Sequence, residues 1–131
     1  MIVVDASVLA PALADDGPDG DTARIRLAGE TLAAPALIDL EVLSAIRSAL
    51  RAGNLDLRRA QLALDDLAQL PLDRAPHEPV MARCWELRDN LTPYDVAYVA
   101  LAEALAVPLV TADRALANAS AIECAVELLS A

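Results

Sequence analysis

Short apolar runs rich in β-branched residues alternate along this chain with longer segments of helical periodicity. The two clearest runs cover residues 2–5 and 107–111, and a third covers 32–34. A strand that is apolar on both faces needs cover on both sides, which a parallel sheet between two layers of helices provides. The alternation therefore predicts a three-layer α/β/α fold with a central parallel sheet.

The segments between these runs carry helical signals. Gly53 and Asn54 interrupt a long helical stretch, so the segments on either side should form a hairpin of two helices. Thr92 and Pro93 are the residue types of an N-cap and a first helical position. We expect helices at about 6–14, 20–29, 35–52, 56–70, 80–90 and 92–106, a loop at 15–20, and weaker strands near 70–72 and 122–126.

Length and composition favour one domain spanning 1–131, because a chain of this size builds a single core. No stretch of 18 uncharged apolar residues and no basic N-terminal region occur, so neither a membrane span nor a signal peptide is expected. Cys84 and Cys124 are isolated, and His77 is the single histidine, which argues against a disulfide framework or a zinc site and favours the cytoplasm. His77 precedes a helix and is expected at the surface.

Four acidic residues stand at the ends of these elements. Asp5 and Asp113 close two of the strand-like runs, while Glu41 and Asp95 lie early in two helices. In a parallel α/β sheet the carboxyl ends of the strands and the starts of the following helices share one edge, where ligands bind. We therefore expect the four side chains to gather at that edge.

Each acid also has a simpler interpretation. Asp5 and Asp113 suit the N-caps of the helices that follow them, and Asp95 suits the acidic half of a capping box with Thr92. Taken one at a time, capping is the commoner role. Glu41 fits that role less well, because it belongs to a narrow polar stripe on a mostly apolar helix, and such a stripe normally faces a partner, a cavity or an ion.

A cluster of carboxylates favours a bound cation. Two carboxylates about 5 Å apart repel by about 3 kcal/mol at an effective dielectric near 20, and four contain several such pairs. Oxygen ligands select hard ions, so Mg²⁺ or Mn²⁺ is the expected cofactor. Such an ion activates water and neutralises phosphoryl oxygens.

Four segments also carry a family resemblance: VDAS at 4–7, EVLSAIR at 41–47, TPYDVAYVALA at 92–102 and LVTADRAL at 109–116. In this order they resemble the successive motifs of PIN-domain ribonucleases, and in particular the VapC toxins of bacterial toxin–antitoxin pairs. The match spans nearly the whole chain. One such motif would be weak support, but four in register are fairly specific.

The resemblance implies a Mg²⁺-dependent endoribonuclease that cleaves RNA by attack of a metal-activated water on a phosphodiester. It assigns metal binding and catalysis to the four acids, and places the hydroxyls of Ser7 and Thr111 along the site. Ser44 stands where the family often has Asn, so we expect a polar role for Ser44 but assign it no particular contact. The resemblance also implies a homodimer and inhibition by a cognate VapB-type antitoxin.

The ten basic residues are all Arg, and the net charge of −10 opposes diffuse binding to nucleic acid. RNA contact must then depend on a local Arg cluster or on bound cations. Arg47, Arg51, Arg58 and Arg59 surround the tip of the expected hairpin, where they suit RNA phosphates or the acids of a protein partner. A solvated helical surface explains them about equally well.

Two other functions compete with the ribonuclease. One is a metal-dependent phosphatase or phosphotransferase of another doubly wound fold, in which an early Asp forms an aspartyl-phosphate. The complete lack of Lys argues against it, because those sites normally use a Lys to hold the phosphate. The other is a non-catalytic PIN-like binding module, against which the presence of all four acids argues.

Overall fold

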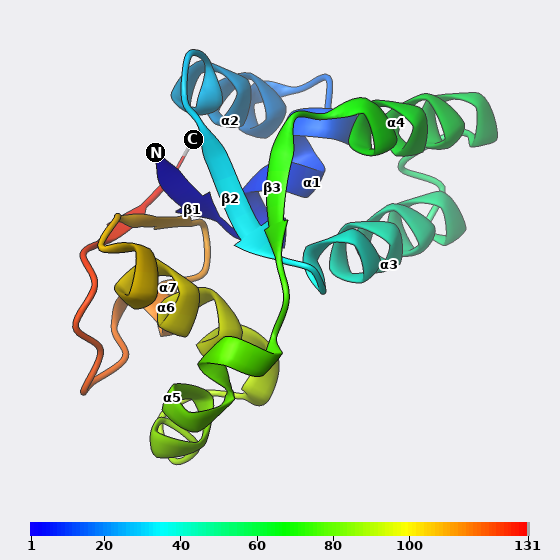
Figure 1. Cartoon of the computed structure of the whole chain (residues 1–131). Helices are drawn as coiled ribbons and strands as arrows, with labels where there is room; N and C mark the ends of the chain where they lie inside the picture. Colours follow the sequence, from blue (N-terminus) through cyan, green and yellow to red (C-terminus); the bar gives the residue numbers. More distant parts are fainter. Residues whose placement is uncertain (131) are drawn as a thin grey trace.

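The structure is a computed structural model that describes residues 1–130, and its centre is a parallel sheet of five strands (Figure 1). The strands lie in the order β3-β2-β1-β4-β5, so β1 occupies the middle. Val4 of β1 is paired with Val110 of β4, which sets the register at the carboxyl edge of both strands. The strands are β1 (Ile2–Val4), β2 (Leu32–Pro35), β3 (Leu72–Ala75), β4 (Leu109–Thr111) and β5 (Val126–Leu128).

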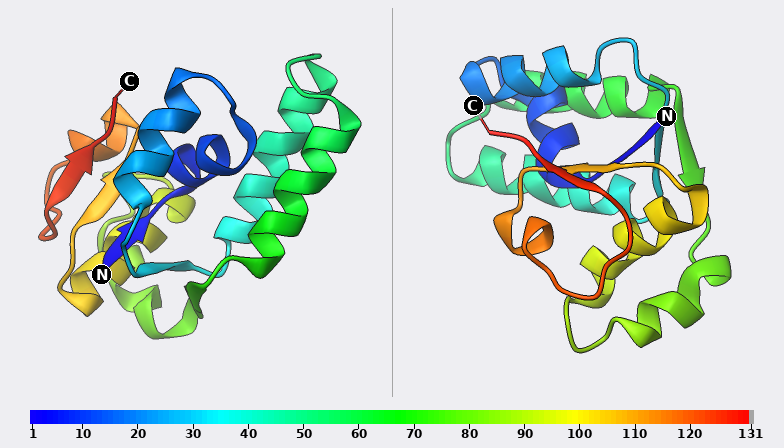
Figure 2. Two further views of the ribbon diagram at one scale, coloured as in Figure 1. Left: turned by 90° about the horizontal axis from the view of Figure 1, so that it is seen from above. Right: turned by 90° about the vertical axis from the view of Figure 1, so that its left-hand side faces the viewer.

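Helices cover both faces of the sheet, which confirms the predicted three-layer architecture. Figure 2 shows α1 and α2 on one side and α6, with α5 and α7, on the other. The helices α3 and α4 pack side by side and extend away from the sheet (Figure 1). The helices are α1 (Ala6–Ala14), α2 (Pro18–Leu27), α3 (Ile38–Arg51), α4 (Leu57–Gln69), α5 (Met81–Glu86), α6 (Pro93–Leu105) and α7 (Arg114–Ala117), with a 3₁₀ turn at Glu78–Val80.

The core consists of the central strands and of α6. Val3, Val4 and Val110 are fully buried, and every residue of α6 from Val96 to Ala102 is buried as well. A helix that is apolar all round belongs inside a protein. Because α6 begins at the N-cap Thr92, whose hydroxyl accepts from the amide of Asp95, its first turn emerges at the edge of the core.

Several boundaries differ from the sequence expectation, each for a local reason. The helix expected from residue 20 begins at Pro18, because Gly17 takes the N-cap position and Pro18 suits the first helical position. The strand expected at 70–72 lies instead at Leu72–Ala75, since Pro71 cannot donate to a ladder. The last strand lies at 126–128 rather than 122–126. Both displaced strands form the edges of the sheet, where exposed polar residues interrupt the apolar pattern that identifies a strand in the sequence.

Within residues 1–130, no helix combines the length and apolarity needed to span a bilayer.

Candidate functional site

The centre of the candidate site is the carboxylate of Asp5, directly after β1. Its side chain is 5 % exposed. Ser7 Oγ donates a hydrogen bond of 2.6 Å to Oδ1, and Thr111 Oγ1 donates one of 2.5 Å to Oδ2. Burial raises the pKa of Asp5 above its usual value, and the Asp113 charge adds to this, while the two hydroxyls oppose it. Asp5 takes the predicted N-cap position of α1, but its side chain makes no capping bond there and is held instead by the two hydroxyls.

Asp113, which follows β4, faces the same edge of the sheet and does cap a helix. Its Oδ1 accepts from the amide of Ala115 at 2.9 Å, and its own amide donates to Thr111 Oγ1 at 3.0 Å. Ser7 Oγ accepts from the amide of Ala112 at 2.8 Å, which joins the start of α1 to the loop after β4. Capping is therefore confirmed for Asp113, and the capping bond uses one of its two carboxylate oxygens.

Asp95 lies half-buried in the first turn of α6. Burial raises the pKa of its carboxyl, a hydrogen bond with the Thr92 side chain opposes the rise, and the charge of Asp113 adds to it. The charge of Asp113 thus contributes to the raised pKa of both Asp95 and Asp5. Although the three residues come from distant parts of the sequence, the fold brings them to one edge of the sheet.

Glu41 reaches this group from α3 and is held by Tyr98 of α6. The hydroxyl of Tyr98 donates a hydrogen bond of 2.6 Å to Glu41 Oε1, and the Tyr98 ring is 1 % exposed. Burial raises the pKa of Tyr98 strongly, and the charges of Glu41 and Asp5 raise it further. The tyrosine was not recognised as a site residue from the sequence. Its signal was nevertheless present, because a Tyr on a wholly apolar helix must find a partner for its hydroxyl.

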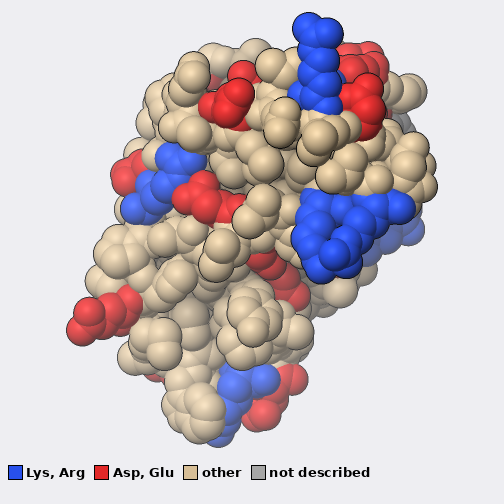
Figure 3. Space-filling view, turned by 90° about the vertical axis from the view of Figure 1, so that its right-hand side faces the viewer, with Lys and Arg blue, Asp and Glu red and all other residues tan. Residues whose placement is uncertain are grey.

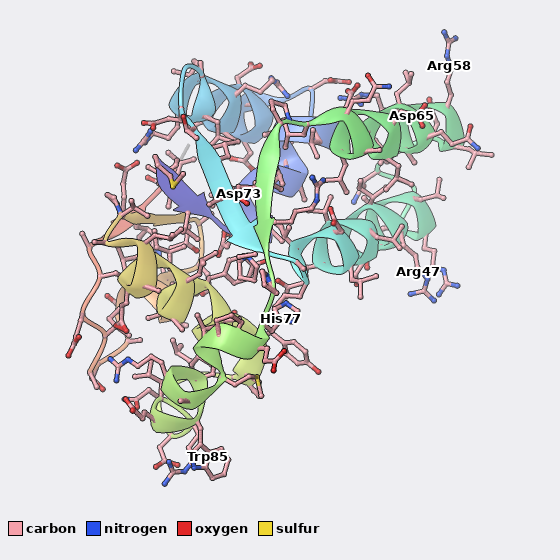
Figure 4. All side chains as sticks on the ribbon, viewed as in Figure 1. Arg47, Arg58, Asp65, Asp73, His77 and Trp85 are labelled. Carbon is pink, nitrogen blue, oxygen red and sulfur yellow. The ribbon has the colours of Figure 1, made fainter. Side chains whose placement is uncertain are left out.

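The N-terminal turn of α3 is fixed by two more contacts. The amide of Leu37 donates to His77 Nε2 at 3.0 Å, and Arg74 Nε pairs with Asp39 at 2.8 Å. His77 follows β3 and precedes the 3₁₀ turn as expected, but it is half-buried and bonded to α3 rather than free at the surface (Figure 4). These contacts connect the sheet edge to the helix that carries Glu41.

The chemistry of the site suits a hard cation. Within residues 1–130, none of the four carboxylates forms an ion pair with an Arg, so their charges are left for an external cation. The donors are all carboxylate or hydroxyl oxygens, the ligands that Mg²⁺ and Mn²⁺ prefer. In the same described range, no three acidic, His or Cys side chains already converge around a point that an ion would fill. Such an ion would therefore have to complete its shell with water, as Mg²⁺ usually does, or turn the carboxylates inward.

The other residues predicted for the site divide into two groups. Ser44 is exposed on α3, and no side-chain hydrogen bond joins it to the four acids within residues 1–130. Arg59 is committed to the fold, since it pairs with Asp16 at 3.1 Å and donates to the carbonyl of Leu13. The side chains of Arg47, Arg51 and Arg58 are exposed on the α3–α4 hairpin. Figure 3 shows a basic patch on this side of the molecule, and Figure 4 shows Arg47 and Arg58 pointing in different directions.

A groove of about 820 Å³ lies between α1, α3 and α4. Ser7 forms one of its walls, so the groove begins beside the hydroxyl that holds Asp5. Small apolar residues such as Ala10, Ala14 and Ala49 line much of the rest. None of the four acids lines the groove itself, and Ser7 is the residue that connects it to Asp5.

Comparison with known proteins gives consistent results. The model of the PIN domain family matches residues 2–122. The chain is 41% identical over 128 residues to Ribonuclease VapC1 of Mycobacterium tuberculosis, covering 97% of this chain and 96% of that protein. It is 40% identical over 130 residues to Ribonuclease VapC12 of the same organism, covering 99% and 100%.

Solved structures share the fold. A crystal structure of Mycobacterium tuberculosis VapC20, described as a Sarcin-Ricin loop cleaving toxin, matches with a TM-score of 0.70 at 14% identity, over 94% of this chain and 97% of that one. PAE2754 from Pyrobaculum aerophilum matches with a TM-score of 0.67 at 28% identity, over 95% and 81%.

The raised pKa of Asp95 predicts that its charge destabilises the metal-free protein. Because the folded-state pKa lies above the unfolded one, ionised Asp95 opposes folding at neutral pH, and this penalty disappears as the pH falls through the folded-state pKa. Asp95→Asn should therefore raise the melting temperature in chelator at pH 7. The gain should shrink on acidification, as measured by thermal melts across pH.

Asp65→Asn, an identical change at an exposed position of α4, is the control and should give no comparable gain. A melting temperature of Asp95→Asn that is unchanged or lower at pH 7 would contradict the prediction.

Proposed function

This chain belongs to the PIN-domain family, and on that premise we propose that it is a VapC-type toxin that cleaves RNA endonucleolytically with the help of Mg²⁺ or Mn²⁺. One observation supports the proposal: the charge of Asp113 acts on both Asp5 and Asp95, Tyr98 holds Glu41 near them, and none of the four carboxylates has an Arg partner among the described residues. The RNA substrate is inferred from the relatives named as ribonucleases.

The metal site is proposed to consist of Asp5, Glu41, Asp95 and Asp113. A divalent cation held there would lower the pKa of a bound water and neutralise the charge on the phosphoryl oxygens. Asp5 is suited to a fixed position, because Ser7 and Thr111 hold both of its oxygens. Glu41 is similarly oriented by Tyr98. The four carboxylates would repel the negatively charged RNA phosphate, and only a cation between them can make this approach favourable.

The chain's own groups also bear on the proton that an attacking water must lose. The pKa of Asp95 is raised by burial, and a carboxylate whose pKa is shifted toward neutrality accepts a proton more readily. Ser7 is a poor candidate for a covalent nucleophile. Its hydroxyl already donates to Asp5, and the imidazole of His77, the one histidine, accepts from Leu37. We therefore propose direct attack by water, with Ser7 and Thr111 as supports of Asp5.

Because the chain belongs to the PIN-domain family, a phosphatase of another doubly wound fold is no longer proposed. A non-catalytic binding module remains as the second candidate, and an RNA cleavage assay distinguishes it from a ribonuclease. We further propose that residues 1–131 form one domain, that the protein acts in the cytoplasm, and that it assembles as a homodimer.

We also propose that a cognate VapB-type antitoxin inhibits the protein. A cluster of carboxylates in a chain of net charge −10 attracts a cationic group, and the groove beside Ser7 offers space for the segment that carries it. An Arg of the antitoxin placed near Asp5 and Asp95 would replace the metal charge and block the RNA phosphate.

Cleavage should require a divalent cation. RNA incubated with the purified protein should be cut in Mg²⁺ or Mn²⁺, left intact in excess chelator, and cut again when Mg²⁺ is restored. Asp95→Asn should lower the rate by at least about 100-fold. It should also reduce the rise in melting temperature on adding Mg²⁺, because less binding energy is linked to the folded state. Robust cleavage in excess chelator would refute the metal mechanism, and a folded wild type that cuts no RNA would favour the binding module.

Tyr98→Phe tests the positioning of Glu41. The substitution keeps the buried ring and removes only the donor, so Glu41 gains freedom to turn away. We expect a loss of about 10–100-fold in cleavage rate and a higher Mg²⁺ concentration for half-maximal activity. Tyr94→Phe is a matched control on the same helix, because Tyr94 is 64% exposed and should be silent. An unchanged Mg²⁺ dependence in Tyr98→Phe would mean that Tyr98 only fills the core.

The antitoxin proposal predicts a specific Arg in the inhibitor. The candidate partner is the small protein encoded beside this gene, and changing the critical Arg to Gln should weaken its inhibition of RNA cleavage by at least about 10-fold. Titration of the partner into the cleavage assay measures the effect. A structure of the complex with only apolar contacts, remote from Asp5 and Asp95, would exclude this mode of inhibition.

A further inference from the structure

Most arginines of this chain already have a partner inside the molecule. Arg88 stacks on the ring of Trp85, with 4.5 Å between the guanidinium carbon and the ring centroid. Ion pairs within the chain occupy Arg24, Arg26, Arg59, Arg74 and Arg83. Within residues 1–130, the arginines left without an ion pair or such a stack are Arg47, Arg51, Arg58 and Arg114. Two of these four lie on α3, the helix that also carries Glu41.

The two arginines of α3 share an exposed face that runs outward from the acidic site. Leu40, Ser44, Arg47 and Arg51 are spaced at i, i+4, i+7 and i+11, and all four are exposed. Glu41 lies at the inner border of this face. A helix rises 1.5 Å per residue, so Arg47 lies about 9 Å and Arg51 about 15 Å along the axis from Glu41. Figure 3 shows basic atoms gathered in one patch at this end of the molecule.

We propose that Arg47 and Arg51 form a phosphate-binding track, which holds the RNA strand on one side of the bond to be cut. The proposal rests on the function proposed above and adds the surface that retains the substrate. A protein of net charge −10 repels a polyanion in general, so the RNA needs local cations beside the acids. Exposed guanidinium groups bind phosphate oxygens through two hydrogen bonds, which suits a backbone contact without base selection.

A protein partner is the competing occupant of this face, since Leu40 is 69% and Leu43 is 43% exposed. The RNA backbone is favoured because the face continues directly from Glu41 and carries Arg and Ser but no acid beyond it on the helix. The track extends from the site in a single direction. RNA on one side of the cleaved bond should therefore matter more than RNA on the other.

The test compares Arg47→Gln/Arg51→Gln with a control of identical charge change, Arg26→Gln/Arg88→Gln, at two arginines that the molecule already pairs with its own residues. Arg26 lies on α2, where it pairs with Glu30 and Glu127, and Figure 4 shows Trp85, the ring on which Arg88 stacks, at another end of the molecule from Arg47. The substrate is a single-stranded RNA of about 20 nucleotides around a mapped cleavage site, longer than typical single-strand binding sites. KM and kcat are measured against salt concentration.

We expect the α3 variant to raise KM by about 10-fold or more at nearly unchanged kcat, with an unchanged melting temperature. Losing two phosphate contacts should also reduce the slope of log(kcat/KM) against log salt by about 1.4. The control variant should match the wild type. Shortening the RNA on one side of the cut should raise KM for the wild type, yet have little further effect on the α3 variant.

Two results would overturn the track. One is an α3 variant whose KM and salt slope equal those of the control, while the wild type cleaves RNA normally; this leaves the proposed ribonuclease intact. The other is an α3 variant that cleaves normally but escapes inhibition by the protein partner, which would assign this face to that partner. A wild type that cleaves no RNA in Mg²⁺ contradicts the proposed function itself, and the track with it.

Discussion

The burial of one carboxylate, that of Asp5, organises the rest of the site. Removing a charged group from water costs free energy unless hydrogen bonds replace the lost solvent. Ser7 and Thr111 supply these bonds, and Thr111 reaches Asp5 only because β4 lies next to β1 in the register Val4 to Val110. Ser7 also accepts from the amide of Ala112, which holds the loop that leads to Asp113. The strand order therefore makes the burial of this charge possible, and the same hydrogen bonds position Asp5 and the loop that carries Asp113.

Glu41 comes from outside the sheet and needs a separate set of supports. The turn before α3 is held by His77, and the helix itself by the pair of Arg74 with Asp39. Tyr98 then fixes the carboxylate from the opposite layer. Arg74 of β3 and His77 after it thus fix the start of α3, while Tyr98 of α6 alone holds the Glu41 side chain. The site is shared by both helical layers, with the carboxyl edge of the sheet between them.

The sequence was informative wherever a local pattern determined the structure. The β-branched run Ile2–Val4 indicated a buried strand, and Thr92 with Pro93 indicated the start of a helix, so the central strands and α6 were predicted well. The edge strands were misplaced because Asp73 and Glu127 interrupt their apolar patterns. The hydrogen bonds of Tyr98 and His77 span 57 and 40 residues, and no local periodicity encodes such contacts. For the same reason, the sequence could not distinguish Arg59, which pairs with Asp16, from the exposed arginines nearby.

Asp95 and Tyr98 stand three residues apart on α6, within one helical turn. One helix therefore supplies one acid directly and orients a second acid from another layer. An inserted or deleted residue between them would rotate one by about 100° relative to the other and separate the two roles. Exchanges among the small apolar residues around them would leave this spacing untouched. During sequence divergence, α6 should consequently tolerate many substitutions but hardly any change of length.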